Sequence, residues 1–239
     1  MKTLNRNLRK RIIEKGYENN MWGYGSAFSC LDAIKYLYDE VLNQKDTFIL
    51  SKGHGAMALY AVLESKGKKP VWMEHPELDE KNGIYATSGS LGHGLPIAIG
   101  RAFAKKIKET ESIVYVLTGD GEMQEGSNWE ALGIASSLHL NVTLLVDCNK
   151  YGSLEKLKGD TKTDNKSLEK KIKTFGFKTK KINGHNIKSL RKIKREEGCN
   201  AILLDTIKGK GISILEKDSP HSYIWKNEKE CSKYLEELK

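Results

Sequence analysis

The chain has 239 residues, of which 38% are hydrophobic and 30% are charged. This composition is typical of a globular protein, and no run approaches the roughly 20 apolar residues that a membrane-spanning helix needs. The segment 1–18 is basic but lacks an apolar signal core, and the four cysteines show no zinc-ligand spacing. We therefore expect a cytoplasmic protein with reduced thiols and no membrane partner, built as one domain over residues 1–239 with a helical tail.

The formal net charge is +9, and much of it comes from lysines scattered between Lys156 and Lys194. Such a charge can indicate nucleic-acid binding, but no nucleic-acid motif is present and aromatic residues do not interleave with the lysines. We therefore expect a solvated, lysine-rich surface and no nucleic-acid partner. The positive field would also attract an anionic sugar phosphate.

Helical and strand patterns alternate along the chain. Helical spacing or a glycine-rich opening predicts helices at 4–15, 29–42, 53–66, 92–108 and 183–197, with a last helix in the tail 218–239. Short apolar runs predict strands at 48–50, 113–117, 142–146, 177–182 and 201–205. This alternation predicts an α/β fold, a doubly wound, mostly parallel sheet with helices on both faces.

Residues 118–152 are the most informative segment. The strand at 113–117 leads into Gly119-Asp120-Gly121, and the strand at 142–146 ends at Asp147-Cys148-Asn149. Neighbouring parallel strands would deliver Asp120 and Asn149 to the same sheet edge, where oxygen ligands suit Mg²⁺ or Ca²⁺ holding a diphosphate. Asp-Gly alone is also a common turn, but the order strand, GDG, helix, strand, Asn is typical of a thiamine diphosphate motif.

Four further blocks support this interpretation: SKGHGAMALYAVL (51–63), TSGSLGHGLPIAIGRAFA (87–104), INGHN (182–186) and DTIKGKGIS (205–213). Together with the GDG segment they resemble the N-terminal part of transketolase, in the form found in split, two-gene members of that family. The resemblance covers nearly the whole chain from about residue 9. It implies transfer of a two-carbon ketol unit between sugars, with thiamine diphosphate carrying the difficult chemistry.

The resemblance also implies a metal site and a cofactor site. Asp120, Asn149 and the carbonyl oxygen of Tyr151 would bind Mg²⁺ or Ca²⁺. The implied contacts to thiamine diphosphate include these three residues together with His54, Ser90, Leu91, Gly92, His93, Gly119, Gly121 and Glu122.

Three histidines are implied to be catalytic, because a side chain with a pKa near neutrality suits proton transfer. His54 would reach the diphosphate and the reaction centre, and His75 would face the substrate. His221 corresponds to a tail histidine of the family, although a surface or capping role is also open. Glu125 is implied to lie at a subunit contact, with a helix N-terminal glutamate as the alternative.

Two departures from the family pattern affect the substrate side. Gly23 stands where the family has a histidine that contacts the donor, so Trp22 or Tyr24 would reshape that wall. In the tail, HSYIW (221–225) replaces the usual His-Gly-x-x-Pro pattern. The cofactor motif is intact, so these departures leave the choice of sugar open.

The family activates its cofactor with a glutamate from a separate pyrimidine-binding domain. We therefore expect a separate pyrimidine-binding transketolase subunit, with two copies of each chain. Three alternatives stay open: a specialised transferase acting on a nucleotide-linked ketosugar, a subunit of a 2-oxo acid decarboxylating enzyme or of a deoxyxylulose phosphate synthase, and a non-enzymatic binding module. The SKGHG and GSLGHG blocks argue against a 2-oxo acid dehydrogenase.

Overall fold

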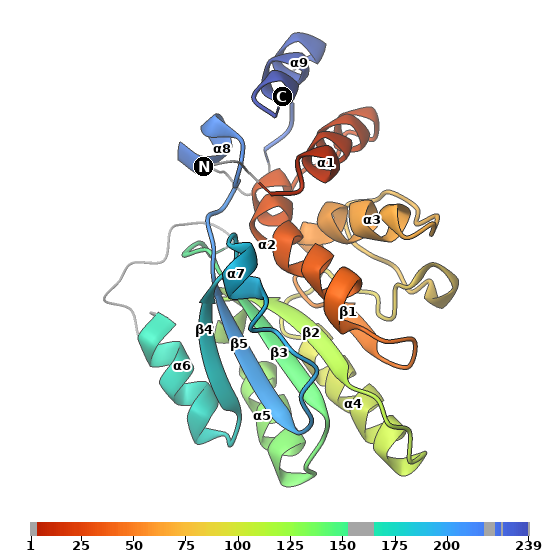
Figure 1. Ribbon diagram of the computed structural model, residues 1–239, viewed down its shortest axis with the longest axis vertical. Coiled ribbons are helices and arrows are strands. Elements are labelled where there is room, and N and C mark those ends of the chain that lie inside the picture. Colours follow the sequence, from red (N-terminus) through yellow and green to blue (C-terminus); the bar gives the residue numbers. More distant parts are fainter. Residues whose placement is uncertain (1–3, 153–164, 218–222, 226, 239) are drawn as a thin grey trace.

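A computed structural model describes residues 4–152, 165–217, 223–225 and 227–238. At its centre lies a parallel five-stranded sheet with the order β1-β2-β3-β5-β4 (Figure 1). The strands are Thr47–Leu50 (β1), Val114–Gly119 (β2), Val142–Cys148 (β3), Lys178–Asn183 (β4) and Cys199–Asp205 (β5). Each of the five predicted strands is therefore present, and their carboxyl ends meet along one edge of the sheet.

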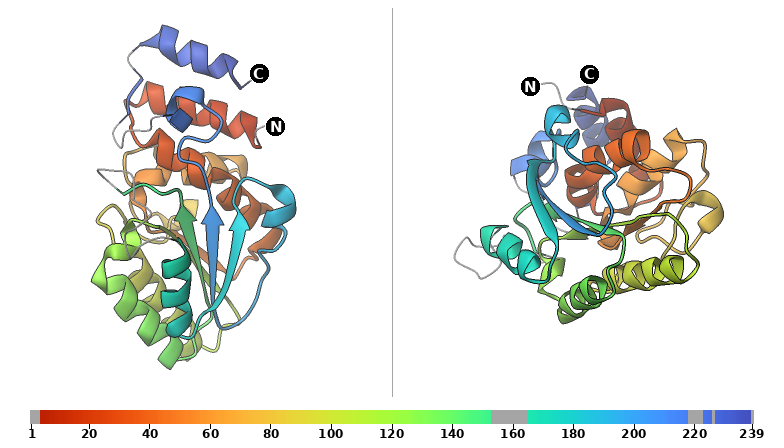
Figure 2. Two further views of the ribbon diagram at one scale, coloured as in Figure 1. Left: turned by 90° about the vertical axis from the view of Figure 1, so that its left-hand side faces the viewer. Right: turned by 60° about the horizontal axis from the view of Figure 1, so that its bottom comes forward.

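Helices cover both faces of this sheet (Figures 1 and 2). One face packs against α4 (Gly94–Ile107), α5 (Gly126–Ser137) and α6 (Asn165–Thr174). The other face packs against α2 (Tyr24–Tyr36), α3 (Ala56–Ser65) and α7 (Ile187–Leu190), while α1 (Arg6–Glu18), α8 (Ser213–Lys217) and α9 (Glu228–Glu236) extend this layer beyond the sheet edge. The sheet is thus covered on both sides, as the doubly wound prediction requires.

Alternation along the strands explains why both layers are apolar. In β2, Tyr115 and Leu117 belong to the core beneath α2 and α3, whereas Val114 and Val116 belong to the core beneath α4 and α5. Successive side chains of a strand point to opposite faces, so a strand covered on both faces is apolar at every position.

The predicted crossover helix at 183–197 is mostly wrong. Only the single turn of α7 forms, capped by the Asn186 side chain, which accepts a hydrogen bond from the backbone N–H of Ser189 at 3.1 Å. In the segment 191–197 only Ile193 is buried. One apolar contact cannot anchor a charged helix against the sheet, so the chain continues to β5 without helical structure.

The tail helix is present and is tied to the rest of the molecule through aromatic contacts. Trp225 lies 5.0 Å from the ring of Tyr24 in α2 and 5.2 Å from that of Tyr234 in α9. Within the described part of the chain, no helix combines the length and apolarity needed to cross a bilayer. The four cysteines are all described, and none of them forms a disulfide.

Candidate active site

A cleft opens at the carboxyl edge of the sheet, where β2 and β3 end. Loops from the strand ends line it together with the start of α2, which places residues distant in sequence around one space. The lining residues are Ser26, Lys52, His54, Leu91, Gly119, Asp120, Gly121, Glu122, Asn149, Tyr151, Gly152 and Lys208.

Asp120 follows β2 and is only 2% exposed. Its carboxylate accepts hydrogen bonds from the backbone N–H groups of Lys150, at 2.8 Å, and of Gly121, at 3.0 Å. Burial raises the pKa of Asp120 to about 7 although these two hydrogen bonds oppose the shift. A buried carboxylate with so high a pKa is one that a cation in the cleft would stabilise in its ionised form.

Asn149 and Tyr151 lie against the GDG turn. The side-chain oxygen of Asn149 accepts a hydrogen bond from the backbone N–H of Tyr151 at 3.1 Å. A Cβ atom on Gly121 would lie 3.0 Å from the Cα of Gly152 and 3.4 Å from the carbonyl oxygen of Tyr151. A side chain at Gly121 would therefore crowd the Tyr151–Gly152 backbone, and the glycine lets the Tyr151 carbonyl lie against the residue that follows Asp120.

The structure thus brings together the three residues predicted to bind a metal. Their donors are a carboxylate, a carboxamide oxygen and a backbone carbonyl oxygen, which fit Mg²⁺ or Ca²⁺. Within the described segments, no group of three or more His, Cys, Asp or Glu side chains could hold a metal ion. A metal bound here would therefore rely on mixed oxygen donors, completed by phosphate oxygens and water.

Glu122 joins three loops around the cleft. It is 2% exposed, and its carboxylate accepts hydrogen bonds from the Ser51 hydroxyl and from the backbone N–H groups of Gly92 and Gly119, both at 3.1 Å. Burial raises the pKa of Glu122 despite these bonds. Because its carboxylate oxygens bind the protein itself, Glu122 shapes the cleft by holding the ends of β1 and β2 to the loop before α4.

His54 lines the cleft as predicted. It lies in the short 3-10 turn Gly53–Gly55 and is half-buried. A Cβ atom on Gly53 would lie 2.7 Å from the carbonyl oxygen of Ser88, so this turn is pressed against the segment leading to the second glycine loop. The two loops predicted to surround the cofactor are therefore in direct contact.

His75 lies beside this pair of loops but does not line the cleft. Its ring meets the ring of Trp22 edge-on, with centroids 5.4 Å apart, and a Cβ atom on Gly89 would lie 3.0 Å from it. Trp22 and His75 thus form a wall next to the cleft, and contact between His75 and a substrate stays a prediction.

The structure explains why Gly23 carries no side chain. Its φ angle is +88°, and a Cβ atom would lie 2.3 Å from the carbonyl oxygen of His54. Of its two neighbours, Tyr24 is fully buried and packs on the tail residue Trp225, away from the cleft. Trp22 alone of the two candidates stands beside His75.

The other predicted site residues are less central. Ser90 and His93 are exposed and do not line the cleft, although Leu91 does. Glu125 is exposed and directly precedes α5, so its position fits both a subunit contact and a helix N-terminal glutamate. His221 lies outside the described residues.

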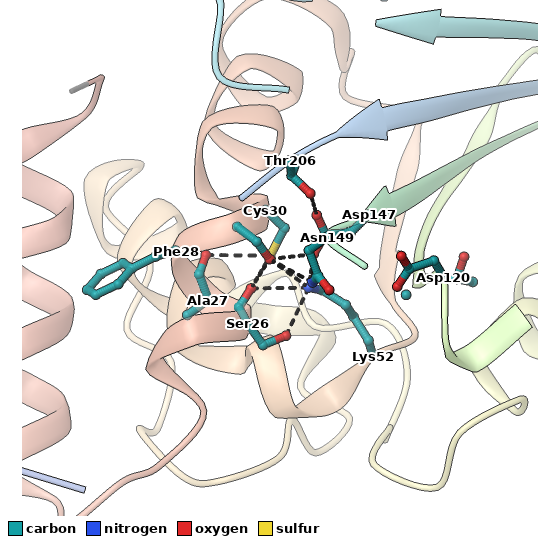
Figure 3. A network of polar contacts seen from close by, with 12 residues as sticks. Ser26, Ala27, Phe28, Cys30, Lys52, Asp120, Asp147, Asn149 and Thr206 are labelled. Carbon is teal, nitrogen blue, oxygen red and sulfur yellow. Dashed lines mark hydrogen bonds and ion pairs between the residues drawn. The ribbon is translucent and has the colours of Figure 1, made fainter. Parts of the chain in front are cut away.

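Sequence reasoning missed four polar residues at or beneath the cleft: Ser26, Lys52, Asp147 and Lys208 (Figure 3 labels the first three). The ammonium of Lys208, which is 7% exposed, lies 4.7 Å from the centre of the Tyr151 ring. The blocks SKGHG and DTIKGKG contained the two lysines. In a chain with 40 lysines and arginines, residue type alone did not distinguish them.

Comparison with known proteins identifies relatives of similar sequence. Residues 35–221 match the family described as Transketolase, thiamine diphosphate binding domain. The chain is 34% identical to an apulose-4-phosphate transketolase subunit of Actinobacillus succinogenes, over 97% of this chain and 93% of that protein. It is 32% identical to 6-deoxy-6-sulfo-D-fructose transketolase subunit SqwG of a Clostridium species, over 87% of this chain and 85% of that protein.

Solved structures support the fold. The transketolase of Campylobacter jejuni superposes with a TM-score of 0.81 at 23% identity, over 97% of this chain and 41% of that chain. The transketolase of Leishmania mexicana superposes with a TM-score of 0.70 at 20% identity, over 98% of this chain and 43% of that chain. This chain therefore spans about two-fifths of each of those proteins, and the predicted doubly wound α/β fold is confirmed.

Proposed function

This chain belongs to the transketolase family, and on that premise we propose that residues 1–239 form the diphosphate-binding subunit of a two-chain enzyme. The enzyme transfers a two-carbon ketol unit from a ketose donor to an aldose acceptor. Relatives whose names describe single subunits of transketolases support a thiamine-diphosphate-dependent transferase that works with a separate partner chain. The observation that carries the proposal is the meeting of Asp120, Asn149 and Tyr151 beside His54 and Lys208 in one cleft.

Each side chain of the cleft has a role in this proposal. Thiamine diphosphate, when bound, supplies the electron sink that allows a carbon–carbon bond beside a carbonyl to break and re-form. Asp120, Asn149 and the Tyr151 carbonyl would hold Mg²⁺, and Lys208 would add positive charge for the diphosphate. His54 lies on the cleft wall, where it can hold or move a proton at a substrate oxygen.

The substrate class we propose is an anionic sugar. Two relatives are named for apulose 4-phosphate and for 6-deoxy-6-sulfo-D-fructose, and each of these sugars carries a negative group. The net charge of +9 would favour the approach of such a substrate. Gly23 occupies the position at which the family has a donor-binding histidine. We assign sugar selection to the wall formed by Trp22 and His75, which would take the place of that histidine.

The partner in this proposal is a pyrimidine-binding subunit, with two copies of each chain. The groove between α4 and α5 offers a surface for assembly, because it is lined by apolar residues such as Phe103 and Ile134, which are 42% and 51% exposed. Exposed apolar residues in one groove favour an interaction site. Glu125 lies at the start of α5, at the cleft end of this groove.

The experiment is reconstitution with the chain encoded beside this one. We expect Mg²⁺- and thiamine-diphosphate-dependent ketol transfer from a sugar phosphate by the pair, and none by either chain alone. The double variant Asp120→Ala/Asn149→Ala should abolish it, whereas Lys150→Ala should not, because Lys150 contacts Asp120 through its backbone N–H. Full activity of the double variant would disprove the site assignment.

The same reconstituted pair tests the alternative substrates. Release of carbon dioxide from pyruvate would favour a 2-oxo acid decarboxylating enzyme, and a higher rate with a nucleotide-linked ketosugar would favour the specialised transferase. Calorimetry that detects no thiamine diphosphate binding by the pair would favour a non-enzymatic module.

A further inference from the structure

A buried ion pair between Lys52 and Asp147 lies at the base of the cleft, which Lys52 lines (Figure 3 shows its contacts). Lys52 comes from the loop after β1, Asp147 comes from β3, and their side chains are 1% and 0% exposed. A buried ion pair is a weak source of stability, because removing two charges from water costs about as much as their attraction returns. Its position suggests that the pair serves the cleft above it.

The ammonium group of Lys52 donates hydrogen bonds to several buried oxygen atoms. Besides Asp147 it donates to the Ser26 hydroxyl at 2.9 Å and to the Ser26 carbonyl oxygen at 3.1 Å. Lys52 is also two residues from His54 in the same loop. The position of Asp147 is therefore tied to the start of α2 and to the histidine loop.

Asp147 in turn contacts Asn149, one of the three residues assigned to the metal. One oxygen of Asp147 accepts a hydrogen bond from the Thr206 hydroxyl. The other accepts from Lys52, from the Ser29 hydroxyl and, at 3.0 Å, from the side-chain nitrogen of Asn149. The carboxylate thus holds the nitrogen end of the Asn149 carboxamide.

This contact distinguishes the two ends of the carboxamide. With its nitrogen on Asp147, Asn149 presents its oxygen to the backbone N–H of Tyr151, at 3.1 Å. A half-turn of the amide would place the oxygen against the Asp147 carboxylate and the NH₂ group against the Tyr151 N–H. Both contacts would be repulsive, so a negative charge at residue 147 selects one orientation.

We infer that Asp147, held in place by Lys52, is a positioning residue that keeps the oxygen rather than the nitrogen of Asn149 available to the metal. The inference rests on the proposed function, because it concerns the metal of that same cleft. Mg²⁺ binds oxygen and has no use for an amide nitrogen, so a reversed carboxamide would cost a ligand. Removing a group that orients a metal ligand typically weakens metal binding by about 10- to 100-fold.

The test replaces both charges at once. In Lys52→Met/Asp147→Leu no unpaired charge is left buried, so the fold should persist, but the nitrogen of Asn149 loses its charged acceptor. We expect the Kd of the reconstituted pair for Mn²⁺, measured by electron paramagnetic resonance with thiamine diphosphate present, to rise by about 10- to 100-fold. Activity should recover at saturating Mg²⁺, so that the metal requirement changes far more than kcat.

A matched control is provided by a second buried ion pair of this chain. Arg9 and Asp32 are 0% and 1% exposed with a 2.7 Å contact, and they do not touch Asn149. Arg9→Met/Asp32→Leu should therefore leave the Kd for Mn²⁺ unchanged even if the melting temperature falls. An equal rise in Kd in both double variants would show a general effect of destabilisation and would overturn the inference.

A second variant covers the case in which the first does not fold. Lys52→Met/Asp147→Asn keeps the shape of residue 147, but without the Lys52 ammonium its amide can present either an oxygen or an NH₂ group to Asn149. It no longer selects one orientation of the Asn149 carboxamide, so it should also weaken Mn²⁺ binding. Unchanged Mn²⁺ affinity in either folded variant would overturn the inference while leaving the proposed function intact. If the two reconstituted wild-type chains failed to bind Mn²⁺ with thiamine diphosphate, that result would instead contradict the proposed function.

Discussion

The two ends of the proposed site, which are the cleft and the Trp22–His75 wall beside it, are built differently. At the cleft end, which we propose binds the diphosphate, Asp120, Glu122 and Asn149 are at most 8% exposed, and each accepts a hydrogen bond from a backbone N–H group. At the substrate end, Trp22 and His75 are only partly buried and meet through an edge-on ring contact. Under the proposed function, the buried sheet edge would fix the cofactor and the less buried loops beside it would select the substrate.

The largest effect is expected where the rigid end is broken. Glu122→Leu would leave the N–H groups of the buried Gly92 and the half-buried Gly119 without acceptors, at up to about 1–3 kcal/mol for each group. We expect a loss of roughly 2–6 kcal/mol in the free energy of unfolding and no cofactor binding, measured by denaturant unfolding and calorimetry. The exposed neighbour Gln124 provides the control, Gln124→Leu, which should change both quantities little. Wild-type stability of Glu122→Leu would contradict the rigid-end description.

The next largest effect concerns the boundary between the two ends. Gly23→His would restore the histidine of the family pattern, yet it would impose a left-handed conformation that costs about 1–2 kcal/mol and a clash with the His54 carbonyl. We expect it to lower kcat/KM by at least about tenfold, the effect of about 1.4 kcal/mol, by displacing His54. Gly67→Ala is a control that separates backbone strain from the clash, since Gly67 has a φ of +78° but nothing within 4 Å of its Cβ position. A gain of activity in Gly23→His would show that the loop rearranges freely.

These residues also show what the sequence could and could not predict. The five strands could be predicted because each lies in a short apolar run. The grouping of Asp120, Asn149 and His54 around one cleft could be predicted because their sequence blocks resemble those of a known family. Lys52 and Asp147 could not, because their importance comes from a contact between loops that are far apart in the chain. The failed helix at 183–197 has the opposite cause: a plausible local pattern that tertiary packing did not support.

A moderate effect is expected from pH. The pKa of Asp120 in the folded metal-free chain is about 7, above its ordinary value of 3.8. The protonated Asp120 carboxyl therefore contributes fully to the free energy of unfolding below pH 3.8. This contribution falls by about 1.4 kcal/mol per pH unit as the pH rises from there through about 7. Metal binding should show the reverse trend and weaken about tenfold per unit as pH falls below 7, because a proton competes with the cation. Asp120→Asn should remove this part of the pH dependence from both the unfolding free energy and the metal affinity. If the pH dependence of the unfolding free energy did not change, other titratable groups would be responsible for it.

The smallest effect is expected at the substrate end, and it gives the sharpest test of the comparison. An edge-on aromatic contact is worth about 0.5–1.5 kcal/mol, so Trp22→Ala should change the KM for the sugar donor by about 2- to 10-fold. The affinity for thiamine diphosphate should not change, because Trp22 does not line the cleft that holds the metal residues. Trp129→Ala is a matched control, since Trp129 packs on Phe175 at 5.7 Å far from this wall. If Trp22→Ala lowered cofactor affinity as much as sugar affinity, the two ends would act as one coupled unit. A residue that only selects the substrate should not change the position of the oxygen atoms that Asp120 and Asn149 offer to the metal.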